Sequence, residues 1–116
     1  MKKTLLLIST LAIIALFANF QKATTTLKIM VYDNLGKIQE QTRVRLYTNK
    51  TDYEKDQNFI SELMTNKNGN AEFINLKAGL YYVSAIKGDK DNSSNGVLTD
   101  TLKEDRLNKM KVIISE

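Results

Sequence analysis

The chain has 116 residues, of which seventeen are Lys or Arg and thirteen are Asp or Glu, giving a formal net charge of +4. It contains no His, Cys, Pro or Trp. These absences exclude imidazole general bases, Ser-His-Asp sites, His-ligated metals, thiolate nucleophiles and disulfides, so a folded domain must be held together by its core.

The N-terminal residues predict export. Lys2 and Lys3 precede a largely apolar run over residues 5–18, which is the pattern of a secretory signal peptide. The run is shorter than the roughly 20 residues that a membrane-spanning helix needs; an uncleaved anchor or a buried core helix are the alternatives. We therefore expect a signal peptide at residues 1–18, a flexible lead-in at 19–24, and a mature protein that is periplasmic, at the cell surface or extracellular, without stable membrane insertion.

The mature chain would be close to neutral. Residues 1–18 hold two of the seventeen basic residues and none of the thirteen acidic ones, so their removal leaves a net charge of +2. The remaining lysines are scattered singly along the chain and do not alternate with aromatic residues. This distribution does not suit a phosphate backbone, and we expect no nucleic-acid partner.

The mature chain contains a series of short segments with the pattern of β-strands. In residues 25–33 the apolar side chains of Leu27, Ile29 and Val31 share one face, and residues 80–87 show the same alternation more strongly. On this basis strands are predicted at residues 25–33, 42–47, 59–65, 71–74, 80–87, 97–102 and 109–115.

Turn-forming residues separate these strands. Turns are predicted at residues 33–36 and 77–79, and residues 66–69 predict a tight hairpin in which Gly69 supplies a positive φ. Polar loops, or single helical turns at the first and last of them, are expected at residues 49–58, 88–96 and 104–108. About seven short strands, with no convincing amphipathic helix, predict one all-β domain over residues 25–116, a β-sandwich.

Spaced apolar residues and turn glycines also carry a family resemblance. The chain contains Leu27-x-Ile29-x-Val31-x-Asp33-x-x-Gly36, then Val44-x-Leu46, then Thr65-x-x-x-Gly69-x-Ala71-x-Phe73-x-x-Leu76-x-x-Gly79-x-Tyr81-x-Val83-x-Ala85. This pattern resembles the transthyretin-like (prealbumin-like) sandwiches, and more closely the carboxypeptidase regulatory-like domains and the collagen-adhesin B-type repeats. The resemblance implies a seven-stranded Greek-key sandwich that lies outside the cytoplasm and is not catalytic, and the Lys- and Asn-rich composition resembles that of bacterial proteins.

Two reactions known in these families are not expected in this chain, because it lacks the residues that they require. The adhesin repeats often join a Lys to an Asn through an isopeptide bond, but the positions of the Lys and of the promoting acid hold Val31 and Ala85. No isopeptide bond is therefore expected. The transthyretin-like hydroxyisourate hydrolases use histidines and a C-terminal Tyr-Arg-Gly-Ser, which this chain lacks. Residues 38–42 replace the family's usual Pro and Gly-Ala, so the resemblance does not define the path of that connection.

The loop at residues 88–96 is a candidate calcium site. Asp91-x-Ser93-x-Asn95-Gly96 places oxygen ligands at alternate positions before a Gly, as in the first half of a calcium loop. The position of the closing acid holds Leu102, and Asp89 or Asp100 could substitute for it in a different geometry. The alternative is a solvated loop rich in turn formers.

Three carboxylates and three tyrosines are the other candidate functional residues. Asp52, Glu54 and Asp56 alternate with lysines, which indicates a solvated loop rather than a catalytic pair, and no enzyme activity is expected. Three tyrosines alternate with inward apolar residues, so they could contact a partner from the outer sheet faces; the alternative is the general preference of strands for Tyr. These are Tyr32, Tyr47 and Tyr82.

The sequence thus predicts an exported, non-catalytic β-sandwich that binds a protein partner in the bacterial envelope or at the cell surface. Contact through an exposed sheet edge or through the loops at one end is expected. The alternative is a module that binds a small ligand, a glycan or calcium through the loop at residues 88–96. No other cofactor is expected.

Overall fold

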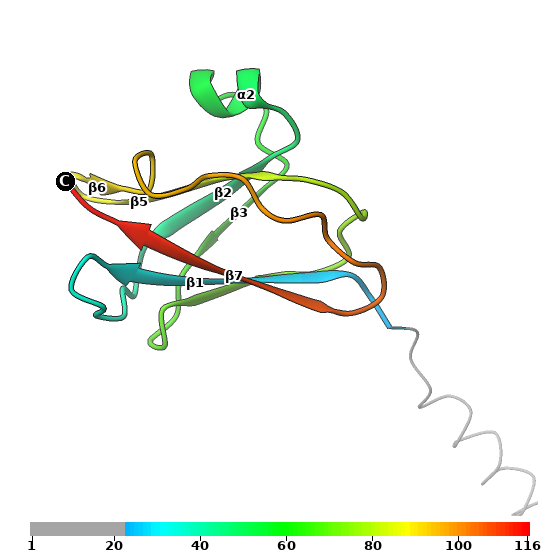
Figure 1. Ribbon diagram of the computed structural model, residues 1–116, viewed down its shortest axis with the longest axis horizontal. Coiled ribbons are helices and arrows are strands. Elements are labelled where there is room, and N and C mark those ends of the chain that lie inside the picture. The colour runs from blue at the N-terminus through cyan, green and yellow to red at the C-terminus, as the bar shows by residue number, and fades with distance from the viewer. Residues whose placement is uncertain (1–22) are drawn as a thin grey trace, which may run out of the picture.

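The computed structural model describes residues 23–116, which form two facing β-sheets with seven strands and one short helix (Figure 1). The all-β prediction is confirmed. The predicted signal peptide at residues 1–18 and most of the predicted lead-in lie outside the described residues. Between residues 23 and 116, no helix has the length and apolar character needed to cross a membrane.

The first sheet is built around strand β1 (Thr26–Asp33). It pairs antiparallel with β4 (Asn70–Phe73) and parallel with β7 (Leu107–Ile114), giving the order β4-β1-β7. Its burial alternates residue by residue, because successive side chains of a strand point to opposite faces.

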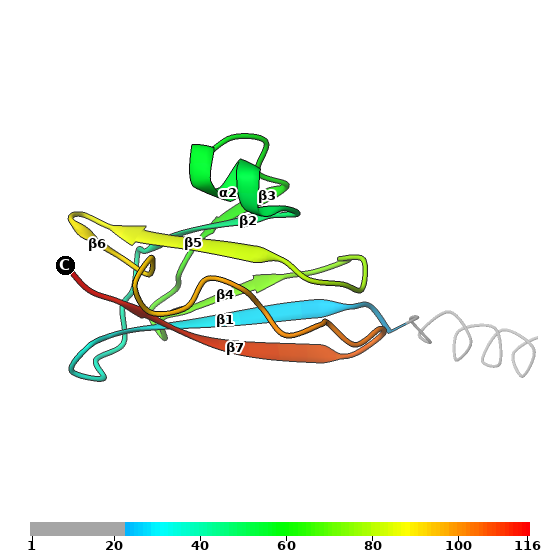
Figure 2. The same cartoon turned by 45° about the horizontal axis from the view of Figure 1, so that its top comes forward.

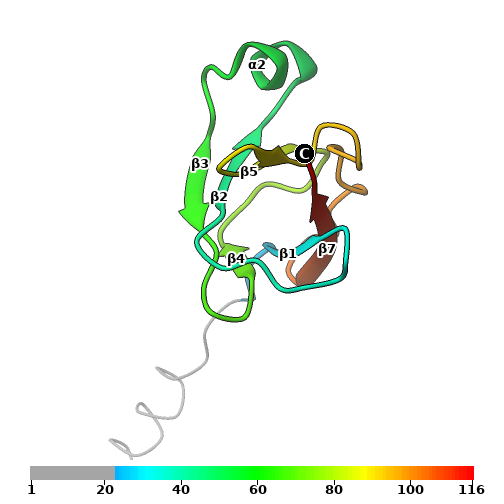
Figure 3. The same cartoon turned by 90° about the vertical axis from the view of Figure 1, so that its left-hand side faces the viewer.

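The second sheet is antiparallel and has the order β3-β2-β5-β6. Its strands are β3 (Ser61–Met64), β2 (Arg43–Tyr47), β5 (Tyr82–Lys87) and the short β6 (Lys90–Asp91). Helix α2 (Lys50–Lys55) connects β2 to β3 and stands on the outer face of this sheet, as Figure 3 shows. It confirms the expected helical turn in residues 49–58.

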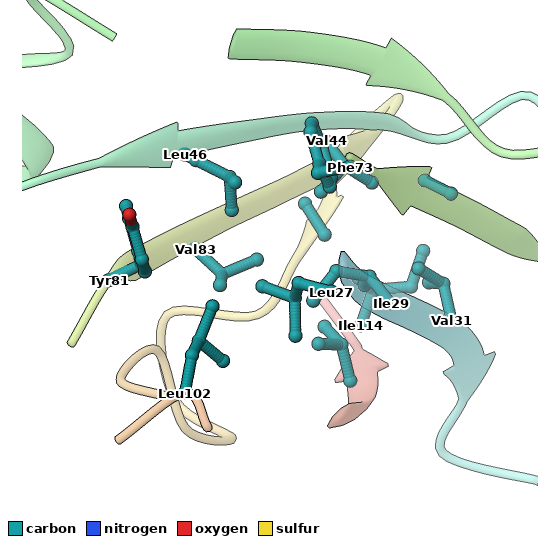
Figure 4. Packing of buried hydrophobic residues seen from close by; sticks show 13 residues of the cluster. Leu27, Ile29, Val31, Val44, Leu46, Phe73, Tyr81, Val83, Leu102 and Ile114 are labelled. Atoms are coloured by element: carbon teal, nitrogen blue, oxygen red, sulfur yellow. The ribbon is translucent and has the colours of Figure 1, made fainter. Parts of the chain in front are cut away.

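The core lies between the two sheets and contains alternating residues from both. Figure 4 shows Val44, Leu46 and Val83 of the second sheet facing Leu27, Ile29 and Ile114 of the first. Leu102 closes one side of this cluster. Among the described residues, every buried polar side-chain atom has a hydrogen-bond partner. The domain, which has no disulfides, therefore avoids the free-energy cost of unpaired polar groups in its interior.

The prediction of a hairpin at residues 66–69 is wrong, although the turn itself forms. Asn66 accepts the amide of Gly69 at 2.9 Å and caps the turn with its side chain. However, β3 pairs with β2 and β4 pairs with β1, so the turn carries the chain from one sheet to the other. The crossing is fixed at Thr65, whose hydroxyl donates to Gln39 and accepts from the amide of Thr42.

The prediction of a strand at residues 97–102 is also wrong. Only isolated bridges, from Leu98 to Tyr82 and from Leu102 to Gly79, join this segment to the second sheet. The cause is the buried side chain of Asn92, which accepts from the amide of Ala85 and donates to the carbonyl of Val83. An amide side chain therefore takes the place of a strand beside β5, and the ladder ends at Asp91.

At the C-terminal end, the helical turn considered for residues 104–108 is replaced by a tight turn and an early start of β7. Asn108 fixes this corner: its side chain accepts from the amide of Lys103 and donates to the carbonyl oxygens of Lys103, Arg106 and Thr26. Strand β7 consequently begins at Leu107, two residues before the predicted start.

A pair of glycine substitutions tests the packing of the crossing turn. A Cβ on Gly69 would lie 2.6 Å from Cγ2 of Ile38 and 2.9 Å from the carbonyl oxygen of Val31, whereas a Cβ on Gly36 would meet nothing within 4 Å. Both glycines have positive φ, +74° and +82°. We expect Gly36→Ala to lower the free energy of unfolding by about 1–2 kcal/mol and Gly69→Ala by about 1–3 kcal/mol more. Urea unfolding of the two variants measures the difference, and equal losses would contradict the close approach.

Candidate binding surfaces

Strand β3 leaves one edge of the second sheet open, since β3 pairs only with β2. The amide of Thr65 donates to the carbonyl of Thr42 at 2.9 Å, and in an antiparallel ladder the residues that bond to the neighbour alternate with those that do not. The backbone groups of Glu62 and Met64 therefore point away from β2, toward the open edge. Such groups can pair with an added strand.

Large apolar side chains gather along this open edge. Phe59, Ile60, Leu63 and Met64 are 41, 47, 37 and 56% exposed, and we call these four residues the β3 strip. Single exposed apolar residues are common on protein surfaces, but contiguous ones on an unpaired edge mark an interaction site or a risk of aggregation. Among the large exposed apolar residues described in residues 23–116, only those of the β3 strip occur as two adjacent pairs in the sequence.

Arg45 holds the start of the β3 strip in place. Its guanidinium bonds Asp56 at 3.0 Å and Glu62 at 3.3 Å, and it lies 4.3 Å from the centre of the Phe59 ring. These contacts connect β2, the end of α2 and β3. The β3 strip is therefore positioned on a fixed backbone rather than on a free loop.

A shallow cavity of about 410 Å³ adjoins the start of β3. Ile60 and Ser61 line it on one side and Ile74 and Leu76 on the other. The floor includes the ring of Tyr81, whose hydroxyl donates to the carbonyl of Lys77 at 2.5 Å. An apolar side chain of a partner could enter this cavity while its backbone pairs with β3.

The three predicted tyrosines have different environments. Tyr47 lies on the outer side of the second sheet in register with Tyr82, but it is 0% exposed because helix α2 covers it. The ring of Tyr53 on α2 contacts Tyr47 edge-on at 5.8 Å and stacks on Tyr82 at 5.9 Å. Tyr47 thus has no surface to offer a partner, and this part of the prediction is corrected by the burial under α2. The involvement of Tyr82 and Tyr32, which are half-buried, stays a prediction.

The hydroxyl of Tyr47 donates to the carboxylate of Asp56, which Arg45 also contacts. Burial and this bond raise the pKa of Tyr47 to about 12, so the hydroxyl keeps its proton at all physiological pH values. The hydrogen bond from Tyr47, together with the bond and charge of Arg45, lowers the pKa of Asp56. Asp56 is therefore an anchor for α2, in keeping with the non-catalytic interpretation of these carboxylates.

The predicted calcium loop is ordered by its own hydrogen bonds. Asp91 accepts from both the amide and the hydroxyl of Ser93, which lowers the pKa of Asp91. Asn95 donates from its side-chain nitrogen to Ser115. Within residues 23–116, no three acidic side chains come together as a metal cluster. Calcium binding by Asp89, Asp91, Ser93 and Asn95 stays a prediction.

The opposite side of the sandwich holds a longer depression. It lies between β7 and the segment at residues 98–103, and its volume is about 560 Å³. Figure 2 shows this segment running beside β7 toward the corner at which β7 begins. Sequence reasoning missed both this depression and the β3 strip, because strand edges are known only once the strand order is known.

Comparison with known proteins gives the fold but no family. No protein-family model and no curated protein sequence matches the chain. Among solved structures, a streptococcal ancillary pilin matches with a TM-score of 0.61 and 18% identity over 82% of this chain. The Bacillus anthracis TIE protein matches with a TM-score of 0.51 and 18% identity over 78%. A Pseudomonas aeruginosa protein described as a candidate carbohydrate-binding protein matches with a TM-score of 0.51 and 15% identity over 84%.

The coverage of these proteins differs widely. The match takes up 33% of the streptococcal chain and 16% of the TIE protein, but 93% of the Pseudomonas protein. At identities this low the matches show a shared two-sheet, all-β architecture. The chain therefore spans about a third of the streptococcal chain and about a sixth of the TIE protein.

The link between Tyr47 and Asp56 can be tested through pH. Tyr47→Phe removes the donor to Asp56, and we expect it to lower the free energy of unfolding by about 1 kcal/mol at neutral pH, a value reduced for the exposure of Asp56. Because the pKa of Asp56 is lower in the folded state than its ordinary value of 3.8, this contribution is complete above that value and is lost as the pH falls through the lowered pKa. Wild type and Tyr47→Phe should therefore converge in stability at acidic pH.

Urea unfolding at neutral and acidic pH measures this convergence. Tyr32→Phe is the matched control, since within residues 23–116 the hydroxyl of Tyr32 makes no hydrogen bond. It should change stability little at either pH. A stability loss in Tyr47→Phe that does not depend on pH would show that the bond to the carboxylate is not its cause.

Proposed function

We propose that this chain is an exported, non-catalytic β-domain that binds a protein partner in the bacterial envelope or at the cell surface, through the open edge of β3. The observation that carries the proposal is the β3 strip, in which four large exposed apolar side chains lie on β3, whose outer edge is open, and on the two residues before it. Natural proteins usually protect such edges with charges, Pro or covering loops. An edge that is apolar and open in the isolated domain is explained if a partner covers it.

The geometry of β3 suits the addition of a partner strand. The open edge offers the backbone groups of Glu62 and Met64, and the neighbouring cavity beside Ile60 could receive a side chain. Main-chain hydrogen bonds would then supply affinity and the cavity would supply specificity. The network around Arg45 holds the edge in an extended conformation before binding, which reduces the entropy lost on association.

The sequence and the comparisons support the cellular location in this proposal. Residues 2–18 have the pattern of a signal peptide, and one of the solved structures with this architecture is a streptococcal ancillary pilin. We further propose that the two sheets are a divergent transthyretin-like Greek-key sandwich. The support is the spacing of the apolar positions from Leu27 to Ala85: those in β1, β2, β4 and β5, with Tyr81, belong to the buried core, and Leu76 packs against it.

A variant pair tests whether the β3 strip makes the contact. Met64→Glu places a charge on the open edge next to Arg43, which can accept it, whereas Leu35→Glu makes the same change on a turn where Leu35 is 77% exposed. The tagged chain and both variants serve as bait in an envelope extract, with mass spectrometry of the captured proteins. We expect one protein to be captured by wild type and Leu35→Glu, and its recovery to fall about tenfold or more with Met64→Glu.

The same experiment is run with calcium and with a chelator. Equal capture by all three baits would place the contact away from β3. Capture only in calcium would transfer the site to the loop at residues 88–96 and would favour the calcium-dependent alternative. A calcium-induced rise in melting temperature would give the same indication without a partner.

A further inference from the structure

The free edge of β7 lies on the side of the sandwich opposite to β3, as the view in Figure 3 shows. The amide of Thr26 donates to the carbonyl of Arg106 at 3.1 Å. This bond, with the register of the parallel ladder, determines which residues of β7 bond to β1. The backbone groups of Asn108 and Met110 then face β1, and those of Lys109 and Lys111 face away from it. Among the described residues, no hydrogen bond joins the backbone of Lys109 or Lys111 to the segment at residues 98–103.

The depression beside this edge, which we call the β7 groove, has five apolar residues in its lining. Its apolar lining comes from β7, from β1 and from the facing segment; these residues are Leu27, Leu98, Leu102, Leu107 and Met110. Leu98 and Leu107 are about half exposed, at 46 and 49%. The open side of the sandwich therefore exposes apolar side chains at the boundary of the core next to polar ones, which include Thr99, Thr101 and Asn108.

The charges around the β7 groove are almost all positive. Lys103, Arg106, Lys109 and Lys111 line it, and Asp100 is the one carboxylate among the described lining residues. None of the ion pairs within residues 23–116 includes any of these four cations. The groove thus combines apolar surface with cations that have no ion-pair partner in residues 23–116, and of these Lys111 lies 5.0 Å from the centre of the Tyr32 ring on β1.

The register of the sheet concentrates this charge on one face. Lys28 of β1 lies directly beside Lys109 of β7, and like charges in register destabilise a sheet. Glu72 of β4 flanks Lys28 on its other side, whereas Lys109 has an open edge on its other side. A carboxylate on a strand added next to β7 would occupy the position in register with Lys109 that is now without an acid.

We propose that the β7 groove binds an extended acidic peptide segment, in which carboxylate and apolar side chains alternate, as an added strand on β7. The backbone of this segment pairs with Lys109 and Lys111. Its carboxylates lie beside the same lysines on the outer face, and its apolar side chains enter the groove beside Leu98, Leu102 and Met110. Alternation is required because successive side chains of a strand point to opposite faces.

This site is separate from the β3 strip and does not depend on the proposed function. The two open edges belong to different sheets and differ in chemistry, since the β3 strip is apolar with Glu62 at its centre and the β7 groove is bordered by cations. One domain could therefore hold two different extended segments at the same time.

A fluorescent peptide of the length of β7, 8 residues, with alternating Glu and Val is the probe. Its control is a peptide of the same composition in which the Glu residues precede the Val residues. We expect the alternating peptide to bind the full chain and the block peptide to bind at least about tenfold more weakly, because only alternation matches both faces of β7. Fluorescence polarisation at low and high salt measures both affinities.

Two double variants locate the site. Lys109→Glu with Lys111→Glu reverses exposed charges on the edge, and we expect it to weaken binding about tenfold or more. Lys37→Glu with Lys67→Glu makes the same change in net charge on exposed turns away from β7. This control shows the effect of net charge alone, and we expect it to change the affinity for the peptide by less than about twofold. Circular dichroism establishes that both variants fold.

Amide hydrogen exchange distinguishes an added strand from simple charge attraction. Strand addition protects the backbone amides of Lys109 and Lys111, which face the open edge. Equal binding of the two peptides, binding without this protection, or no binding at millimolar protein would overturn the proposal. Association with anionic lipid vesicles in place of the peptide would also overturn it, since a lipid surface gives no ladder on β7.

Discussion

The parallel pairing of β1 with β7 is the constraint on which the rest of the domain depends. It runs in unbroken register from Thr26 beside Leu107 to Asp33 beside Ile114. Parallel neighbours cannot be joined by a hairpin, so every other strand has to form between the two ends of this ladder. Bringing together the two ends of so long a segment costs conformational entropy, and the ladder alone does not offset this cost. The second sheet offsets it, because Val44, Leu46 and Val83 bury the inner face of β1.

The same constraint produces the open side of the sandwich. Asp91 is bridged to Ser115 at the end of β7, yet the chain must return to Leu107 to begin that strand. Residues 92–106 therefore run the length of the domain, and the side chain of Asn92 holds their start against β5. Because the backbone of this return path bonds to β5, and only the side chain of Asn108 joins its end to β7, it leaves the backbone edge of β7 free. The β7 groove is thus a result of topology as much as of local sequence.

Sequence patterns identified the strands better than their neighbours. Alternation at Leu27, Ile29 and Val31 and at Tyr81, Val83 and Ala85 located the inward faces correctly, since burial depends only on local periodicity. The turn at Gly69 was found, but local turn chemistry does not specify whether the next strand joins the same sheet. The burial of Tyr47 was missed because it depends on where α2 stands. The β3 strip was missed for a similar reason: apolar residues such as Phe59, Ile60, Leu63 and Met64 have the same sequence pattern on an edge as in the centre of a sheet.

The direction of β7 relative to β1 also determines how the domain would respond to tension. The chain enters β1 at Thr26 and leaves β7 at Ile114, and the register places these residues at opposite ends of the ladder. A pull on the chain at both sides of the domain is therefore directed along the strands and loads all the bonds between β1 and β7 together, instead of breaking them one after another. Shear of this kind gives a small domain high mechanical resistance without covalent cross-links.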